Sequence, residues 1–362
     1  MNILHIISAP ASGGAEVYVK DLAKCLASQG HNLHIAFLSN ASDVGRDPVY
    51  EENFLNDLKS SGVNIYIIGN ETRKKPWLGM LRIKRYISDH NIDICHTHLA
   101  YGVFFSFLLI IPVIYTHHTI SPRWGKFTYT LFNKIVDEYV GISKACATAL
   151  SGYTGRSVNV IMNAIADDKF RKYIRVRKSE QVITIAMVGR LNIHKDYLNM
   201  LQALNLLDET YKNRIRVLIA GEGDKDYKKK LVYFIEQNKL TDTVAFFGIK
   251  ENIPEFLYQA DVFLMSSSTE GLPIALIEAT ISGLPCIVTD VGGCAEVIEN
   301  SKNGIVVPPK NSKALADAII HLINQPKLIE EYSRNAIQSS TQYSISKSAK
   351  LHLDLYSSIL SK

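Results

Sequence analysis

The sequence predicts an α/β protein with two doubly wound parallel sheets, each in its own domain. Short apolar stretches alternate with helical patterns through the first half of the chain, and strict strand–helix alternation favours parallel strands with right-handed crossovers. The same alternation restarts at residue 182, which indicates a second sheet. The chain has 362 residues, 47% of them hydrophobic, which is enough for a sizeable core in each of two domains.

The first sheet is predicted from apolar strands that alternate with amphipathic helices. Its strands are expected at residues 2–7, 32–38, 64–68, 92–96, 113–116, 137–142 and 158–162. Its helices are expected at residues 15–30, 51–61, 78–90, 101–110, 124–134 and 143–152. The longest apolar run, 99–115, contains Gly102 and Pro112, so a helix followed by a buried strand explains it better than a membrane span.

The second sheet follows a basic, glycine-free stretch, 167–180, which we interpret as the linker. Its strands are expected at residues 182–189, 216–221, 243–248, 261–265, 285–289 and 304–307, each followed by a helical segment. The end of the chain is helical, at 311–325, 326–340 and 344–361. The predicted domains are therefore 1–170 and 171–343, with a terminal helix in 344–362.

The cysteines and the amino terminus predict a cytoplasmic protein. Five cysteines are scattered without a CxxC pair, which is typical of reduced thiols. Met1 and Asn2 lead straight into an apolar strand without a basic region, so no secretory leader is expected.

Positive charge is concentrated in the first half of the chain. Residues 1–178 hold 21 Lys and Arg against 14 Asp and Glu, whereas residues 179–362 hold 19 against 21. Much of the excess lies in 73–75, 82–85 and 169–178, and apolar residues such as Trp77 interleave with the first two stretches. Such a surface favours peripheral contact with an anionic membrane or an acidic acceptor, and a merely solvated basic face is the alternative. A nucleic-acid partner is not predicted.

The stretch 266–279 joins an apolar strand to a helix and carries two carboxylates. Pro273 fits the first turn of a helix, so Glu270 should lie in the loop before it and Glu278 about two turns in. Unpaired N–H groups and the helix dipole make such a helix start an anion site. Together these features suit a bound nucleotide sugar. The alternative is an ordinary helix with one glutamate at its start and one solvated glutamate.

Two further loops at strand ends could contact phosphate. Arg190 and Lys195 follow the strand 182–189, and their charges could neutralise a diphosphate without a metal. Gly13 and Gly14 open a helix after the first strand, so backbone N–H groups could approach a phosphate closely. The second loop does not have the GxGxxG pattern, so by itself it is weak evidence for a phosphate site.

Histidines gather at two predicted strand ends in the first half. His96 and His98 lie at the end of one predicted strand and His117 and His118 at the end of the next, but no cysteine or carboxylate completes a zinc pattern, so no metal site is predicted. His5 and His96 are interpreted as core residues, and the role of His98 is left open.

Taken together, these motifs resemble the retaining glycosyltransferases of family 4, which have the GT-B fold. The resemblance covers nearly the whole chain and is more specific in the second half, where D-x-GG…E and NG-x-x-x-PP motifs accompany the two glutamates. The family usually has a glycine after the lysine that matches Lys195. Asp196 stands there in this chain, which leaves the local turn open.

The resemblance implies two Rossmann-like domains facing a cleft, with the last helix returning to the amino-terminal domain. It implies that Gly14, Arg190, Lys195, Gly271 and Leu272 face the donor diphosphate. The loop with Ile249 would face the base, Glu278 the ribose and Glu270 the sugar, and His118 would orient the acceptor hydroxyl. No metal or other cofactor is expected.

The expected function is a retaining transfer of a hexose or N-acetylhexosamine from a nucleotide diphosphate sugar. Uridine is the expected nucleoside of that donor. The acceptor would be a hydroxyl of a lipid-linked saccharide in O-antigen, lipopolysaccharide, capsule or exopolysaccharide assembly, at the inner face of the cell membrane. The alternatives are a nucleotide-sugar 2-epimerase and a non-catalytic nucleotide-binding scaffold.

Overall fold

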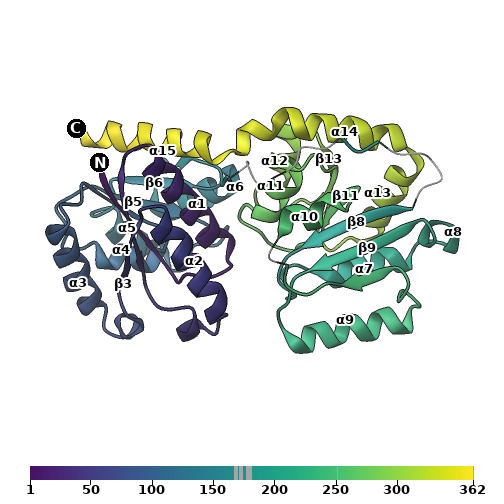
Figure 1. Ribbon diagram of the computed structural model, residues 1–362, viewed down its shortest axis with the longest axis horizontal. Coiled ribbons are helices and arrows are strands. Elements are labelled where there is room, and N and C mark those ends of the chain that lie inside the picture. Colours follow the sequence, from purple (N-terminus) through teal and green to yellow (C-terminus); the bar gives the residue numbers. More distant parts are fainter. Residues whose placement is uncertain (167–169, 171–173, 177–181, 251, 362) are drawn as a thin grey trace. The chain divides into compact units, whose positions relative to one another are not determined.

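The computed structural model describes residues 1–166, 170, 174–176, 182–250 and 252–361. Its contacts divide the chain into two compact units, which are Met1–Ala166 with Ser344–Lys362 (unit 1) and Asp167–Tyr343 (unit 2). Each unit holds one parallel sheet with helices packed against it, so the predicted fold class is confirmed (Figure 1). The predicted boundary after residue 170 and most of the predicted linker fall outside the described residues.

Unit 1 contains a seven-stranded sheet with the order β3-β2-β1-β4-β5-β6-β7. Its strands are β1 (Asn2–Ile7), β2 (Asn32–Phe37), β3 (Asn64–Ile67), β4 (Ile94–Thr97), β5 (Val113–His117), β6 (Glu138–Gly141) and β7 (Asn159–Val160). Its helices are α1 (Gly14–Ser28), α2 (Pro48–Ser60), α3 (Pro76–Asp89), α4 (Ala100–Phe105), α5 (Lys126–Phe132), α6 (Lys144–Thr154) and α15 (Ile345–Leu360). The strand order reverses between β1 and β4, and loops at the carboxyl ends of such strands form the usual ligand site of a doubly wound sheet.

Unit 2 contains a six-stranded sheet with the order β10-β9-β8-β11-β12-β13. Its strands are β8 (Ile183–Val188), β9 (Ile215–Ala220), β10 (Val244–Phe246), β11 (Val262–Met265), β12 (Cys286–Thr289) and β13 (Gly304–Val307). Its helices are α7 (Tyr197–Asn205), α8 (Glu209–Lys212), α9 (Lys225–Gln237), α10 (Ile253–Tyr258), α11 (Ile274–Ile281), α12 (Cys294–Ser301), α13 (Ser312–Asn324) and α14 (Pro326–Ser339). Here the order reverses between β8 and β11, the two strands that precede the Lys195 and Glu270 loops.

The carboxyl-terminal helix α15, yellow in Figure 1, belongs to unit 1 and lies beside α1. Tyr18 of α1 hydrogen-bonds Ser348 Oγ (2.8 Å) and His352 Nε2 (2.9 Å) of α15. Tyr356 of the same helix hydrogen-bonds His96 Nδ1 at 2.7 Å. The expected return of the last helix to the amino-terminal domain is therefore confirmed.

The helix predicted at 101–110 is wrong in its second half, because α4 ends at Phe105. Pro112 disfavours helix for the residue before it, and the chain makes a turn closed by a hydrogen bond from Leu109 N to Ser106 O (3.1 Å). As a result Phe107, Leu108 and Ile110 lie on the surface, with Ile110 fully exposed.

Arg175 also differs from expectation, because it is buried in unit 2 and not part of a basic surface. Its guanidinium donates to the carbonyl oxygens of Leu257 (3.3 Å), Ala260 (3.3 Å) and Ser282. These carbonyls lie at or just beyond the carboxyl-terminal ends of α10 and α11, where the helix dipoles favour positive charge. The charge of Arg175 therefore stabilises the interior of unit 2.

Candidate active site

The loops after β8 and β11 bring Lys195 and Glu270 into direct contact. Lys195 Nζ lies 2.6 Å from Glu270 Oε1, and the two side chains are 22% and 12% exposed. Ser267 Oγ donates to the same oxygen at 2.6 Å. Because the pair is largely shielded from water, it interacts more strongly than a surface ion pair. Ser267 was not singled out from the sequence, although it stands three residues before Glu270.

Side chains and backbone tie the two loops together. Ser266 Oγ donates to the carbonyl of Asp196 (2.9 Å), and Ser268 N donates to the carbonyl of His194 (2.8 Å). Asn192 Oδ1 accepts from the backbone N–H groups of His194 (3.1 Å) and Lys195 (3.0 Å). The backbone of Lys195 is thus fixed from both sides, which limits how far its ammonium group can move.

Asp196 makes a left-handed turn directly before α7. Its backbone is left-handed, with φ 46° and ψ 49°, a conformation that aspartate tolerates better than most residues. Its side chain also accepts a hydrogen bond from Asn199 N (3.4 Å) and so caps α7. Asp196 therefore makes the turn next to Lys195 and caps α7.

A close backbone approach explains the Gly-Gly pair before α12. A Cβ on Gly292 would lie 2.1 Å from the carbonyl oxygen of Glu270 and 2.6 Å from that of Gly271. Gly292 also has φ +57°, and Gly293 N donates to the carbonyl of Gly271 at 2.7 Å. The glycines let the start of α12 support the loop that carries Glu270.

The helix that follows Glu270 places the second carboxylate. Pro273 is the N-cap of α11, and Glu278 is half-buried in the second turn of the helix. Leu272 is buried and Gly271 is half-buried in the loop between. The two glutamates therefore lie on either side of the start of α11, where backbone N–H groups are not used by the helix itself.

Arg190 and Ile249 lie on neighbouring loops of the same sheet edge. Arg190 is exposed directly after β8, and Ile249 is 68% exposed after β10. The loop after β9 is hydrogen-bonded to the Arg190 loop, with Leu191 N donating to the carbonyl of Glu222 (3.1 Å). All the predicted site residues of unit 2 thus lie at the carboxyl-terminal side of its sheet.

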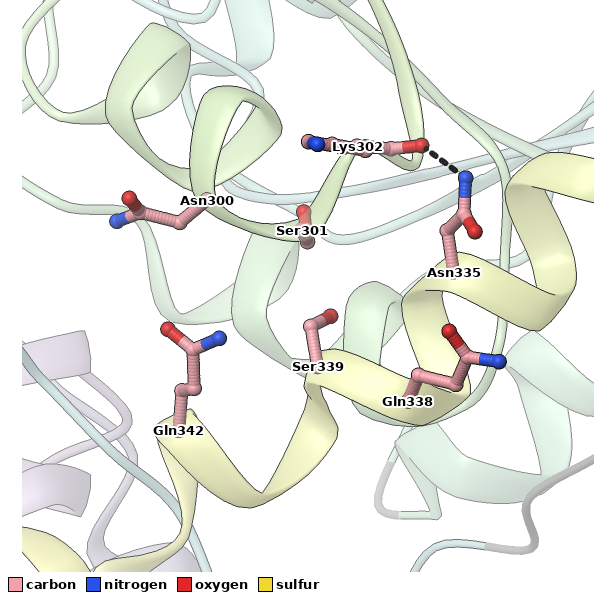
Figure 2. Close-up of a pocket in the computed structure, with 7 residues that line it drawn as sticks. All are labelled: Asn300, Ser301, Lys302, Asn335, Gln338, Ser339 and Gln342. Carbon is pink, nitrogen blue, oxygen red and sulfur yellow. Dashed lines mark hydrogen bonds between the residues drawn. The ribbon is translucent and has the colours of Figure 1, made fainter.

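Two hollows in unit 2 differ in their relation to these residues. The smaller, with about 180 Å³ of empty space, lies between the ends of β8 and β11 and includes Lys195 and Ser267 in its lining. The larger, with about 440 Å³, lies at the carboxyl-terminal end of α12, opposite to the end that supports Glu270 (Figure 2). It is lined by polar side chains, namely Asn300, Ser301, Lys302, Asn335, Gln338, Ser339 and Gln342, and by none of the predicted site residues.

In unit 1, Gly14 is the first residue of α1 and is exposed. The helix start is not empty, however, because Glu16 lies over it and hydrogen-bonds Ser8 Oγ. A Cβ on Gly13 would lie 2.0 Å from Glu16 Oε2. A phosphate that approached Gly14 would therefore meet a carboxylate, which would have to turn away. Sequence reasoning missed Glu16.

His118 is half-buried after β5, and its Nε2 lies 3.0 Å from Nδ1 of His98. Burial lowers the pKa of His118 to about 3, with a smaller contribution from the charge of His117. His118 is therefore neutral at physiological pH. His98, whose role the sequence left open, is therefore a hydrogen-bond partner of His118. His5 and His96 lie in the core, as expected.

The chain matches two families of known proteins that together span residues 12–339. Residues 12–169 match the family described as Glycosyltransferase Family 4, and residues 168–339 match Glycosyl transferases group 1.

Individual proteins give the same result. The N,N'-diacetylbacillosaminyl-diphospho-undecaprenol alpha-1,3-N-acetylgalactosaminyltransferase of Campylobacter jejuni is 27% identical over 191 residues, 53% of this chain and 48% of that protein. An uncharacterized glycosyltransferase of Methanocaldococcus jannaschii is 27% identical over 389 residues, 91% of this chain and 93% of that one. The crystal structure of HepE from Anabaena in complex with UDP-glucose is similar in fold, with a TM-score of 0.81 and 19% identity over 99% of this chain and 100% of that chain.

Proposed function

Because the chain belongs to the glycosyltransferases that combine a family 4 domain with a group 1 domain in the GT-B fold, we propose a specific reaction for it. It transfers a hexose or N-acetylhexosamine from a nucleotide diphosphate sugar to a hydroxyl of a lipid-linked saccharide, with retention at the anomeric carbon. UDP-glucose in the Anabaena neighbour supports a UDP-sugar donor, and the diphospho-undecaprenol acceptor in the name of the Campylobacter relative supports a lipid-linked acceptor.

The Lys195–Glu270 ion pair is the observation that carries this proposal. An ammonium group has three N–H donors, and the contact with Glu270 Oε1 uses one of them. The other two can reach phosphate oxygens of the donor. Glu270 Oε1 accepts from both Lys195 and Ser267, so the second carboxylate oxygen is the one that would accept from sugar hydroxyls. One pair thus holds both the leaving group and the sugar.

The remaining predicted residues complete this site in our proposal. Arg190 and the loop at Gly271 and Leu272 stabilise the charge that develops on the diphosphate. Glu278 binds the ribose hydroxyls. The departing phosphate oxygen takes the proton of the acceptor hydroxyl while the new bond forms on the same face of the sugar. Because the protein supplies positive charge itself, the reaction needs no divalent metal.

Without an acceptor, we expect the purified protein to hydrolyse one donor slowly in a panel of UDP-, GDP- and ADP-sugars. This hydrolysis releases the free nucleotide. Release is measured by chromatography of the free nucleotide, with and without EDTA. Release that resists EDTA and depends on one UDP-sugar would agree with the proposal. Loss of activity in EDTA would contradict the metal-independent mechanism. Epimerised sugar nucleotide in place of free UDP would contradict transfer itself.

A surface of unit 1 suits contact with a membrane that holds the lipid-linked acceptor. Trp77 and Leu81 of α3 are 55% and 56% exposed, and α3 packs against α4, whose following loop carries the exposed Phe107, Leu108 and Ile110. Exposed lysines flank the apolar side chains, namely Lys74, Lys75 and Lys84. Arg82 differs from them, because it bonds the carbonyl of Ile68 and the carboxylate of Glu71 within the unit. Among the described residues, no helix is both long and apolar enough to cross a bilayer.

The combined substitution Lys74→Gln, Lys75→Gln and Lys84→Gln is expected to weaken binding to phosphatidylglycerol vesicles by about 100-fold, since each lysine near an anionic surface contributes about 1 kcal/mol. Vesicle co-sedimentation gives the partition constants, and neutral phosphatidylcholine vesicles give the baseline. The matched control is Lys225→Gln, Lys229→Gln and Lys230→Gln on α9 of unit 2. An equal loss in both variants would show that total charge, and not this surface, drives binding.

A further inference from the structure

Three histidines form a continuous hydrogen-bonded chain inside unit 1. His5 lies in β1, His98 directly after β4 and His118 directly after β5, and these three strands are neighbours in the sheet. His5 Nδ1 is 3.0 Å from His98 Nε2, and His98 Nδ1 is 3.0 Å from His118 Nε2. His98 therefore uses both ring nitrogens to connect a core residue to the proposed acceptor-orienting residue.

Two further imidazoles, those of His96 and His352, are bonded to residues outside this chain of histidines. His96 has its ring centroid 4.2 Å from that of His98, but its Nδ1 pairs with Tyr356 (2.7 Å) and its Nε2 with Thr116 (2.7 Å). His352 Nε2 pairs with Tyr18 at 2.9 Å. The chain thus has three members and two ends.

Both end atoms are enclosed and lack a hydrogen-bond partner among the described residues. They are His5 Nε2 and His118 Nδ1. His5 is completely buried and His98 is 5% exposed, whereas His118 as a whole residue is half-buried. The two end atoms are therefore both enclosed, but His118 lies nearer to the protein surface than His5 does.

All three rings are neutral at physiological pH, because burial lowers the pKa of His5 and His118 to about 3 and that of His98 well below its usual value. A neutral imidazole carries one N–H donor and one acceptor nitrogen. If His5 Nδ1–H donates to His98 Nε2, then His98 must carry its proton on Nδ1 and donate to His118 Nε2, and His118 must carry its proton on Nδ1. The reverse arrangement has every proton on Nε2. The chain therefore allows only these two arrangements.

The two arrangements differ in where the unpaired N–H lies. With every proton on Nε2, the unpaired donor lies at His5, in a core where none of the described residues accepts it. With every proton on Nδ1, the unpaired donor lies at His118, a half-buried residue outside the core, where water or a bound ligand can supply an acceptor after a small movement of the side chain. A buried N–H without a partner is costly, so the second arrangement is favoured.

We propose that His5 and His98 are positioning residues that hold His118 as the neutral Nδ1–H tautomer, so that His118 donates a hydrogen bond to a substrate oxygen and does not remove a proton. This inference rests on the proposed function for the identity of that oxygen, which belongs to the sugar or to the acceptor hydroxyl. It agrees with a reaction in which the departing phosphate takes the proton of the acceptor. A metal ion bound by His5, His96 and His98 is the rival explanation, since ligand atoms of these residues lie within 4.8 Å of one another.

The tautomers can be read directly from histidine side-chain ¹H–¹⁵N correlation spectra of protein labelled with ¹⁵N-histidine. His118 is assigned from the signals that disappear in His118→Gln. We expect His5, His98 and His118 to be neutral with the proton on Nδ1 at pH 7.5. Protons on Nε2, or a positively charged His118, would overturn the proposal without any need for a core variant. So would one equivalent of metal in the protein as purified, measured by plasma mass spectrometry.

Variants of His98 test the connection itself. His98→Gln and His98→Leu should release His118 from the Nδ1–H form, giving Nε2–H or a mixture of tautomers. His34→Gln is the matched control, because His34 is also a buried histidine of unit 1, and its hydrogen bond is to Tyr86 (2.9 Å) and not to another histidine among the described residues. An unchanged His118 tautomer in a folded His98 variant would contradict the proposal. The spectra do not depend on turnover, so an Nδ1–H chain in a protein that releases no nucleotide would contradict only the proposed function.

Discussion

Lys195→Ala is expected to lower kcat for nucleotide release from the donor by about 10²–10³-fold, the usual effect of removing one group that stabilises developing negative charge. The substitution removes the ammonium group 2.6 Å from Glu270 and leaves a carboxylate that is only 12% exposed without its counter-charge. The donor diphosphate then faces a repulsive negative charge in place of a balanced pair. The measurement is nucleotide release at several donor concentrations, with the melting temperature of each variant as a check on folding.

Glu270→Gln and the double variant Lys195→Ala with Glu270→Gln test whether the two residues act together or independently. Because both residues act in one contact, the double variant should lose less than the product of the two single losses. Lys313→Ala is the control, since Lys313 forms a pair of similar length with Asp317 (2.7 Å) on the exposed surface of α13. Its activity should stay within about 2-fold of wild type, as expected for a surface ion pair. Turnover of Lys195→Ala within a few-fold of wild type would refute the role of Lys195.

The sequence was sufficient to predict the parts of this site that depend on local order along the chain. Strand–helix alternation predicted both sheets, and the position of Lys195 and Glu270 at strand ends predicted one shared edge. It could not show that Asp196 would adopt a left-handed backbone and cap α7, because that conformation depends on the supporting loop. Nor could it show that Glu16 would lie over the start of α1.

Features that depend on distant residues were beyond sequence reasoning. Arg175 has the pattern of a surface charge, and its burial follows from carbonyl groups 82 to 107 residues further along the chain. His5 and His98 are 93 residues apart, and only the pairing of β1 with β4 brings them together. The early end of α4 is a local feature, but it depends on a turn that competes with helix, and hydrophobic periodicity does not distinguish the two.

Unit 1 is expected to unfold on acidification, with a midpoint between about pH 3 and about pH 5.5. Burial lowers the pKa values of His5, His118 and His352 to about 3, so the folded state keeps these rings neutral while the unfolded state protonates them below about pH 6.5. The unfolded state therefore binds more protons in this range, and stability falls as pH falls. Each group costs about 1.4 kcal/mol per pH unit, so three groups cost about 4 kcal/mol per unit. A domain stability of about 5–15 kcal/mol is exhausted within a few units.

Tryptophan fluorescence reports this transition selectively, because the chain has only two tryptophans and both, Trp77 and Trp124, lie in unit 1. His352→Gln removes one titrating ring and should move the midpoint to lower pH, whereas His321→Gln, at an exposed position of unit 2, should not. Carboxylates affect stability at lower pH than the histidines do. Burial would raise the pKa of Asp57, but Lys24 and Lys20 hold it below 3.8, so its contribution is lost only under more acidic conditions. Tryptophan emission that stays native down to pH 3 would therefore show that the histidines of unit 1 are not held neutral by burial, and the two-arrangement argument for His118 would lose its premise.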